Sequence, residues 1–305
     1  MSITNKTIAL VIVTYNRCNL LMEMLSSIEN MSVKPDIVYV IDNNSSDNTS
    51  SVVTECDSRK NINIKYHNTG YNAGGAGGFY IGSKMAYEDG WDRIWLADDD
   101  IVLDKECLSN AMEYDDGRTI LQPMRYNMDG SCAEISAIQY DLSNPFYLRP
   151  KRKTVQNIFN KNILSYDIQS IPFEGPIIPR EVFNVIGFPD ERFFIFNDDL
   201  DFAIRAQRAG FSIKCITNAK IVRKIPFVQS VALKTWKGYF MFRNYFRVQK
   251  VYGSSPLIYL RILLVFCLAL GHSLVRMDIN SIKMLCGALK DGLSQEFKLT
   301  EKYKP

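Results

Sequence analysis

Short apolar runs alternate with amphipathic segments through the first hundred residues. Apolar runs rich in β-branched residues predict buried strands, and apolar positions that recur every three or four residues predict helices. The runs that predict strands are 7–16, 36–42, 63–68 and 92–100, and the helical segments between them are 20–31, a turn within 51–58, and 78–90. Strands that alternate with helices indicate βαβ units, a parallel sheet and an open α/β architecture.

The pattern weakens between residues 141 and 170, which are polar and poorly periodic, so we expect an excursion or flexible loop over a site there. Order returns with a short helix over 180–187 and an amphipathic helix over 198–210, whose first turn is acidic. Acidic side chains suit the positive end of a helix dipole, so capping by itself explains one or two of these acids.

The character of the chain changes after residue 225, where aromatic side chains mix with Arg and Lys before an apolar stretch at 257–275. Arg261 and His272 interrupt this stretch and leave a longest apolar run of nine residues, 262–270. A helix that spans a membrane needs about 20 apolar residues. The pattern therefore favours a helix that lies at a membrane surface or packs against protein over one that crosses a bilayer.

Composition and charge add a second contrast between the two parts of the chain. The 305 residues are 47% apolar and 23% charged, which excludes low-complexity disorder, and the seven cysteines include no CxxC pair, which favours a reducing compartment. Residues 1–222 carry 22 Lys and Arg against 29 Asp and Glu, whereas residues 223–305 carry 14 against 4. A basic, apolar end indicates attraction to an anionic membrane surface, with a solvated basic face as the alternative. No nucleic-acid recognition motif accompanies the charge.

Polar side chains follow three of the predicted strands, and in parallel sheets ligands lie beyond the carboxyl ends of the strands. These positions are Thr14, Asp42 and the three acids Asp98, Asp99 and Asp100. Adjacent carboxylates repel, and a divalent cation that also binds a diphosphate would neutralise them. Because side chains alternate along a strand, we expect Asp98 and Asp100 to face one way and Asp99 the other. Five glycines between Gly70 and Gly78 would let the backbone lie against a sugar or phosphate, with a flexible loop as the alternative.

Four segments in this order resemble the family 2 glycosyltransferases of GT-A fold. They are VIVTYNR at 11–17, IDNNSSDNTS at 41–50, LADDD at 96–100 and NDDLDFAIRAQRAGF at 197–211, within a likeness that extends over roughly residues 7–250. The stretch NAGGAGGF is similar to the bacterial galactofuranosyltransferases, with rhamnosyltransferase-like relatives second. The resemblance implies a catalytic GT-A domain, with a Rossmann-like nucleotide-binding sheet, over residues 1–225. A C-terminal helical, basic and apolar extension would then occupy residues 226–305.

The resemblance also implies roles for individual residues. Asp199 matches the catalytic base, and Asp98 and Asp100 match the acids that bind a divalent metal, Mn²⁺ or Mg²⁺. Asp198 and Asp201 would instead cap the helix or position Asp199. The residues expected to contact the donor are Thr14, Asp42, Asn72, Gly74, Gly75, Asp98, Asp99, Glu134 and Arg223.

The chain departs from the family pattern in two places. Relatives carry a histidine ligand for the metal after the 198–210 helix, but this chain has only His67 and His272, neither of which fits, and Arg223 or Lys224 stands in that region. A cation there would contact the diphosphate and weaken the dependence on metal. The galactan-building relatives also place tryptophans after a glycine in the acceptor loop, where this chain has Gly175-Pro176-Ile177.

The resemblance favours an inverting transferase that moves galactofuranose from a UDP-sugar to a lipid-linked or polysaccharide acceptor. We expect it to act at the cytoplasmic face of the cell membrane, with the C-terminal region as a peripheral membrane anchor or, alternatively, an oligomer interface. A dTDP-rhamnose-dependent transferase and a catalytically decayed nucleotide-sugar-binding protein remain alternatives. A Rossmann oxidoreductase is disfavoured because the glycines follow the third strand and lack the GxGxxG setting.

Overall fold

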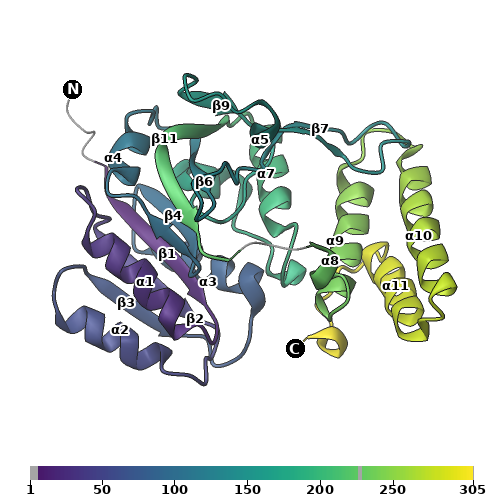
Figure 1. Ribbon diagram of the computed structural model, residues 1–305, viewed down its shortest axis with the longest axis horizontal. Helices are drawn as coiled ribbons and strands as arrows, with labels where there is room; N and C mark the ends of the chain where they lie inside the picture. Colours follow the sequence, from purple (N-terminus) through teal and green to yellow (C-terminus); the bar gives the residue numbers. More distant parts are fainter. Residues whose placement is uncertain (1–5, 226–228, 305) are drawn as a thin grey trace.

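The computed structural model describes residues 6–225 and 229–304, and within these residues nine strands form one sheet (Figure 1). The order of the strands is β3-β2-β1-β4-β10-β6-β11-β5, and β9 pairs with β11. The strands of this sheet are β1 (Ile8–Thr14), β2 (Ile37–Asp42), β3 (Ile64–Asn68), β4 (Arg93–Asp98), β5 (Ile101–Leu103), β6 (Ile120–Tyr126), β9 (Ser165–Asp167), β10 (Ile177–Pro179) and β11 (Ile213–Arg223).

The predicted βαβ units are confirmed, because β1 pairs in parallel with β2 and β4, and β2 pairs in parallel with β3. The register aligns Thr14 with Asp42, and Asp42 with Asn68. Asp98 lies opposite Val13 on the other side of β1. The polar ends of all four strands therefore meet at one edge of the sheet, as the sequence predicts.

Helices cover both faces of the sheet. One core cluster packs α1 (Cys18–Glu29), α2 (Thr49–Ser58) and α4 (Cys107–Met112) against one face. The other cluster packs α3 (Gly74–Glu88), α6 (Arg180–Ile186) and α7 (Asp198–Arg208) against the opposite face. The segment 51–58 forms most of a full helix rather than a single turn.

The glycine-rich stretch belongs mostly to a helix, and not to the flexible loop that was the alternative interpretation. Helix α3 begins at Gly74 and lies close to β1 and β2. A Cβ atom at Gly78 would lie 2.5 Å from Val13 Cγ1, and one at Gly82 would lie 2.3 Å from Val11 Cγ1. These glycines allow a close approach between helix and sheet, so their role is packing rather than contact with a ligand.

Residues 141–170 are also more ordered than their polarity predicts. β7 (Ala137–Tyr140) and β8 (Lys151–Thr154) form a separate antiparallel pair, followed by α5 (Val155–Ile158). β9 then joins the main sheet by antiparallel pairing with β11. Residues 141–150 contain no helix or strand, as expected for an excursion. Short strands with exposed polar side chains lack the alternation that identifies a strand from sequence, so β8 and β9 were not predicted.

The C-terminal helices are α8 (Gln229–Ala232), α9 (Lys237–Tyr252), α10 (Ile258–Val275) and α11 (Ile279–Gly292), and short 3₁₀ turns lie at Glu191–Phe193 and Glu301–Tyr303. They lie on one side of the sheet domain, with α10 at the outer edge (Figure 1). Helix α9 packs against α11 and shares buried clusters with residues 193–204. The expected start of this region at residue 226 lies outside the described residues, so the division at 225 stays a prediction.

Among the described residues, α10 is the one helix whose length and apolar composition would suffice to cross a membrane. Its buried residues are Ile258, Arg261 and Ile262, whereas Leu263 and Leu268 are 54% and 60% accessible. Arg261, in contrast, is fully buried and forms an ion pair with Asp141 at 3.1 Å. It also donates to Gln249 Oε1 at 2.7 Å, so Arg261 ties α10 to the protein.

Candidate functional site

Three neighbouring aspartates lie where β4 ends, beside the end of β1. Thr14 Oγ1 donates a hydrogen bond to Asp99 Oδ2 at 2.8 Å. Arg17 Nη1 lies 3.0 Å from Asp99 Oδ1 and 3.2 Å from Asp100 Oδ2. Asp99 and Asp100 therefore reach the same guanidinium, which differs from the expected alternation. The strand ends at Asp98, and the chain turns immediately after it, so the strand period no longer applies.

The carboxylates carry more negative charge than their surroundings neutralise. Burial raises the pKa of Asp98 well above its usual range, and Asp100 and Glu174 raise it further. Burial and the neighbouring Asp99 raise the pKa of Asp100 to about 6, although Arg17 opposes the shift. A cation bound between Asp98 and Asp100 would relieve this repulsion.

The donor set fits a divalent cation that is shared with a diphosphate. No group of three or more His, Cys, Asp or Glu side chains is arranged to hold a metal in residues 6–225 and 229–304. Asp98 and Asp100 would supply carboxylate oxygens to such an ion. Mg²⁺ commonly binds through one or two carboxylates, with phosphate oxygens and water completing its shell.

Asp42 and the residues around it form the neighbouring part of the site. Asp42 is buried, and its carboxylate accepts hydrogen bonds from Ser45 N at 2.9 Å and Tyr66 Oη at 2.6 Å. Its side chain therefore fixes the turn after β2 against β3, and its expected contact with a nucleotide remains a prediction. Asn43, the next residue after Asp42, is buried and donates to Gly74 O at 3.0 Å.

The two glycines at the start of α3 differ in how much space surrounds them. Gly74 has φ +72°, and a Cβ there would lie 2.3 Å from Phe194 O. Asn72 Oδ1 accepts a hydrogen bond from Gly74 N at 2.9 Å, so Asn72 holds the start of the helix. A Cβ at Gly75 would meet nothing within 4 Å, so Gly75 is the glycine that borders open space.

Glu174, which precedes β10, links two arginines at the centre of the site. Glu174 Oε2 lies 3.0 Å from Arg125 Nη1 and 2.8 Å from Arg223 Nε. Arg223 lies near enough to lower the pKa of Asp100, whereas Lys224 pairs with Glu23 at 2.7 Å. Of the two cations proposed to replace the missing histidine, Arg223 is the one at the site.

Glu134 is enclosed by protein, and its expected contact with sugar hydroxyls remains a prediction. It is fully buried, and its two oxygens accept hydrogen bonds from Arg125 at 2.8 and 3.0 Å. Burial opposes ionisation, yet Arg125 lowers the pKa of Glu134 below its usual range. Glu134 therefore orients Arg125, and through it Glu174, from beneath the site.

Asp199 lies in the first turn of α7, and its Oδ1 accepts a hydrogen bond from Leu200 N at 2.7 Å. Burial raises its pKa to about 6, Lys151 lowers it in part, and Glu174 raises it. Asp201 has a different role, because it bonds Arg205 in α7 and Tyr252 in α9. The charges of Glu174 and Lys151 thus both act on Asp199.

Sequence reasoning missed Arg17, Lys151 and Glu174. Arg17 is the last residue of the first family-like segment, and its place in that segment could have identified it as a site residue. Glu174 is a single acid beside Gly175, which has φ +114°, where a Cβ would lie 2.2 Å from Ile221 Cδ1. The stretch 175–177 is no free acceptor loop, since Gly175 N donates to Leu96 O and Ile177 lies in β10.

The chain is similar to known proteins both in sequence and in fold. The model of glycosyl transferase family 2 matches residues 9–173. The galactofuranosyltransferase GlfT1 of Mycolicibacterium smegmatis is 30% identical over 226 residues, which are 70% of this chain and 69% of that protein.

Two solved structures share the fold at low sequence identity. GalNAc-T7 with UDP, GalNAc and Mn²⁺ aligns with a TM-score of 0.61 and 15% identity, over 82% of this chain and 48% of the other. TarS residues 1–349 of S. aureus with UDP-GlcNAc align with a TM-score of 0.59 and 17% identity, over 94% and 80%. The chain thus spans about half the length of the GalNAc-T7 chain that it matches.

Proposed function

Because the chain belongs to glycosyltransferase family 2 and has the GT-A fold, we propose that it transfers galactofuranose from UDP-galactofuranose to a glycan acceptor, with inversion at the anomeric carbon. The similarity to a galactofuranosyltransferase supports the choice of sugar. The structural neighbours solved with UDP and UDP-GlcNAc support a uridine diphosphate donor.

One observation carries the proposal: Asp98 and Asp100 at the end of β4 and Asp199 in α7, far apart in the sequence, all interact electrostatically with Glu174. After burial, Glu174 is among the causes that raise the pKa values of Asp98, Asp100 and Asp199. This interaction supports a base on α7 that lies close to the edge of the sheet where we expect the diphosphate to bind. A transferase needs this proximity, because the acceptor hydroxyl must be deprotonated beside the anomeric carbon.

In the proposed reaction, the Asp199 carboxylate accepts the proton of the acceptor hydroxyl. The hydroxyl oxygen then forms a bond to the anomeric carbon as the bond from that carbon to the diphosphate oxygen breaks. UDP leaves with the bonding electrons, and the new glycosidic bond has inverted configuration. No covalent intermediate between sugar and protein is required.

The donor side of the site must stabilise the negative charge of the departing UDP. Asp98 and Asp100 would hold Mn²⁺ or Mg²⁺, which supplies positive charge to the diphosphate. Arg223 lies on the same side of the site, where its guanidinium is held by Glu174 at 2.8 Å and adds a second cation. Gly75 leaves room for the donor at the start of α3.

The test of this function is a panel of sugar donors with the full chain and Mn²⁺, measured as release of nucleoside diphosphate with and without a lipid-linked glycan. We expect UDP release from UDP-galactofuranose, stimulated by the acceptor. Release from dTDP-rhamnose alone would establish a rhamnosyltransferase instead. Tight binding of UDP without turnover of any donor would establish a decayed transferase.

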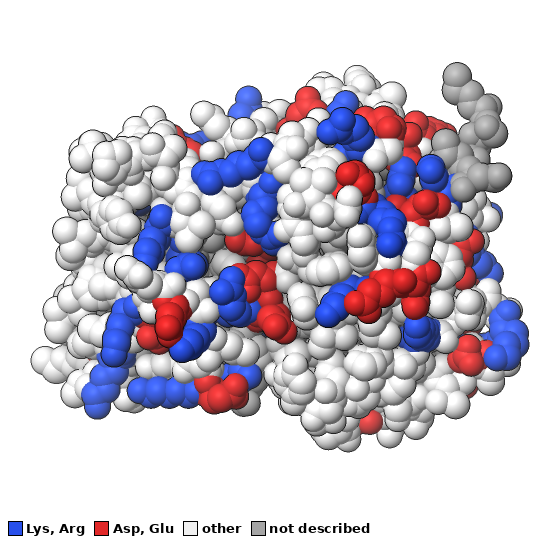
Figure 2. Space-filling model, turned by 180° about the vertical axis from the view of Figure 1, so that it is seen from behind, with Lys and Arg blue, Asp and Glu red and all other residues white. Residues whose placement is uncertain are grey.

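We further propose that the reaction takes place at the cytoplasmic face of the cell membrane, where the acceptor would be lipid-linked. The exposed apolar side of α10 supports this placement, together with the excess of 14 Lys and Arg over 4 Asp and Glu in residues 223–305. On the face drawn in Figure 2, the left edge, where the C-terminal helices lie, carries uncharged surface above and a group of Lys and Arg side chains below.

A further inference from the structure

The segment that leads into α7 has an unusual backbone. Phe194, Phe196 and Asn197 have φ values of +64°, +67° and +63°, in the left-handed region that favours glycine. Such a conformation is strained for a residue other than glycine, and it persists only where the surroundings enforce it. Because Asp199 follows two residues later, this segment determines where the carboxylate of Asp199 lies.

The carbonyl groups of this segment are held from outside it. Asn244 Nδ2 donates to Phe193 O, Ile195 O and Phe196 O at 3.0, 2.8 and 2.9 Å. The remaining carbonyl of the turn, Phe194 O, accepts from Ala76 N at 3.0 Å. One side chain of the C-terminal region therefore binds three of four successive carbonyls, and the start of α3 binds the fourth.

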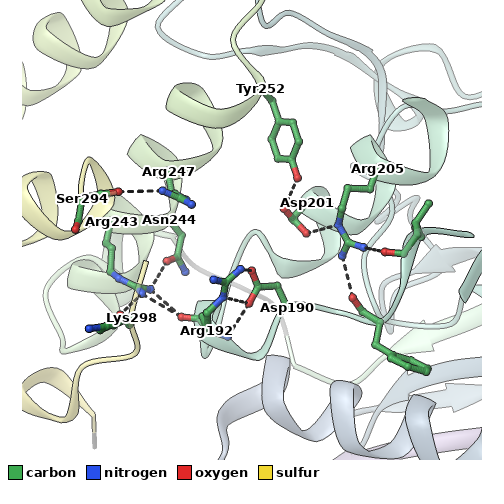
Figure 3. A network of polar contacts seen from close by, with 12 residues as sticks. Asp190, Arg192, Asp201, Arg205, Arg243, Asn244, Arg247, Tyr252, Ser294 and Lys298 are labelled. Atoms are coloured by element: carbon green, nitrogen blue, oxygen red, sulfur yellow. Dashed lines mark hydrogen bonds and ion pairs between the residues drawn. The ribbon is translucent and has the colours of Figure 1, made fainter. Parts of the chain in front are cut away.

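Asn244 is itself fixed in orientation. It is fully buried in α9, and its Oδ1 accepts a hydrogen bond from Arg243 Nη1 at 2.8 Å, which turns its amide donors toward the carbonyls. Arg243 also donates to Arg192 O at 3.1 Å and to Lys298 O at 2.7 Å (Figure 3). The amide cannot rotate without breaking these contacts.

From this geometry we infer that Asn244 is a positioning residue for Asp199: it holds segment 193–197 in its left-handed conformation and so sets the place of the base. The inference rests on the proposed function of Asp199 as the base. It assigns the C-terminal helices a part in catalysis that is separate from any contact with a membrane or a second copy. The hydrogen bond from Ala76 to Phe194 joins the same segment to the donor side of the site.

The experiment compares Asn244→Ala and Asn244→Ser with Gln249→Ala in the full chain. Gln249 is a matched control because it is a fully buried amide on the same helix, and it bonds Arg261 rather than segment 193–197. Three quantities are measured: kcat and KM for the donor, the pH dependence of kcat, and hydrogen exchange of the amides in residues 193–200. The exchange measurement requires no acceptor.

For both Asn244 variants we expect faster exchange in residues 193–200, a kcat lowered by about tenfold or more, and a donor KM changed by less than about threefold. The acid limb of the pH profile should move in these variants, and Gln249→Ala should match the parent in all three measurements. Unchanged exchange and kcat in the Asn244 variants would overturn the inference, as would an equal loss in Gln249→Ala. If the parent transfers no sugar from any donor, the proposed function fails, while the exchange data still decide whether Asn244 holds the segment.

Discussion

At the scale of single residues, Asp199 combines a fixed place with a pKa suited to a base. Replacing it with Asn preserves the shape but removes the proton acceptor. We expect Asp199→Asn to bind UDP as the parent does and to lose transfer by roughly 10²-fold or more. Isothermal titration measures the affinity for UDP, and a transfer assay measures the rate of sugar transfer. Turnover close to that of the parent would remove Asp199 from the mechanism.

The pH profile offers a second test at this scale. Burial raises the pKa of Asp199 to about 6, and the base works only when ionised, so kcat should fall as the pH drops through about 6. The positive charge of Lys151 lowers this pKa. Lys151→Met should therefore move the acid limb to higher pH, while Lys153→Met, on the same short strand, should leave it in place. An acid limb that is the same in all three proteins would contradict this role of Lys151.

The metal-binding role rests on Asp98 and Asp100. In Asp100→Ala, we expect Mn²⁺ to lose its stimulation of donor binding, because a single remaining carboxylate holds the ion poorly beside a diphosphate. The described residues offer no third metal ligand, so metal affinity should be weak and Arg223 should support residual donor binding. Activity of the parent that is unchanged by EDTA would show that these acids do not act through a metal.

At the scale of elements, the glycines of α3 divide into two kinds. Gly82→Ala brings a methyl group to about 2.3 Å from Val11, so we expect it to destabilise the fold by roughly 1–3 kcal/mol. Gly75→Ala has open space for its methyl group, so its stability should equal or slightly exceed that of the parent. Urea unfolding of the two variants checks the difference.

The variants Gly82→Ala and Gly75→Ala also distinguish a glycine needed for packing from a glycine needed for donor binding. If Gly75 borders the donor, Gly75→Ala should weaken UDP binding even though the protein is fully stable. Equal stability of the two variants would show that α3 can move away from the sheet. Unchanged UDP affinity in Gly75→Ala would place the donor elsewhere along this helix.

At the scale of the whole molecule, the outer face of α10 is the feature that the catalytic fold does not use. We expect the full chain to sediment with vesicles of anionic lipid and to be released at high salt, because basic residues near such a surface contribute about 1 kcal/mol each. The paired substitution of Leu263→Asp and Leu268→Asp should abolish this binding and leave donor hydrolysis intact. Val185→Asp is the control, since Val185 is 53% exposed but lies on α6.

Substitution is a better test here than truncation. A chain that ends at Tyr252 would lack α11, whose Leu285 packs with Phe246 of α9 and Ile262 of α10. The loss of α11 would disturb α9 and with it Asn244. Reduced activity of the shortened chain would therefore not show whether the protein binds a membrane. If the full-length protein does not bind anionic vesicles and forms a stable dimer in light scattering, the result would favour an oligomer interface on α10.

The sequence by itself determined the parallel half of the fold and the edge at which the site lies. Runs such as 8–13 and 37–41 are apolar throughout, and their order with intervening helices leaves few ways to build a sheet. Because parallel strands end at one edge, Thr14, Asp42 and Asp98 are brought together by topology alone. The family-like segments added Asp199 as the candidate base, and the family itself is confirmed by the comparisons.

Only the tertiary structure decided how the site is completed. Glu134 and Arg125 face each other beneath it, Glu174 reaches it from the turn before β10, and Asn244 holds the segment before Asp199 from a helix some 50 residues away. None of these contacts follows a local period, because each depends on how separate elements pack. A buried ion pair and a buried amide have the same sequence signature as exposed ones, so their roles become visible only when their partners are known.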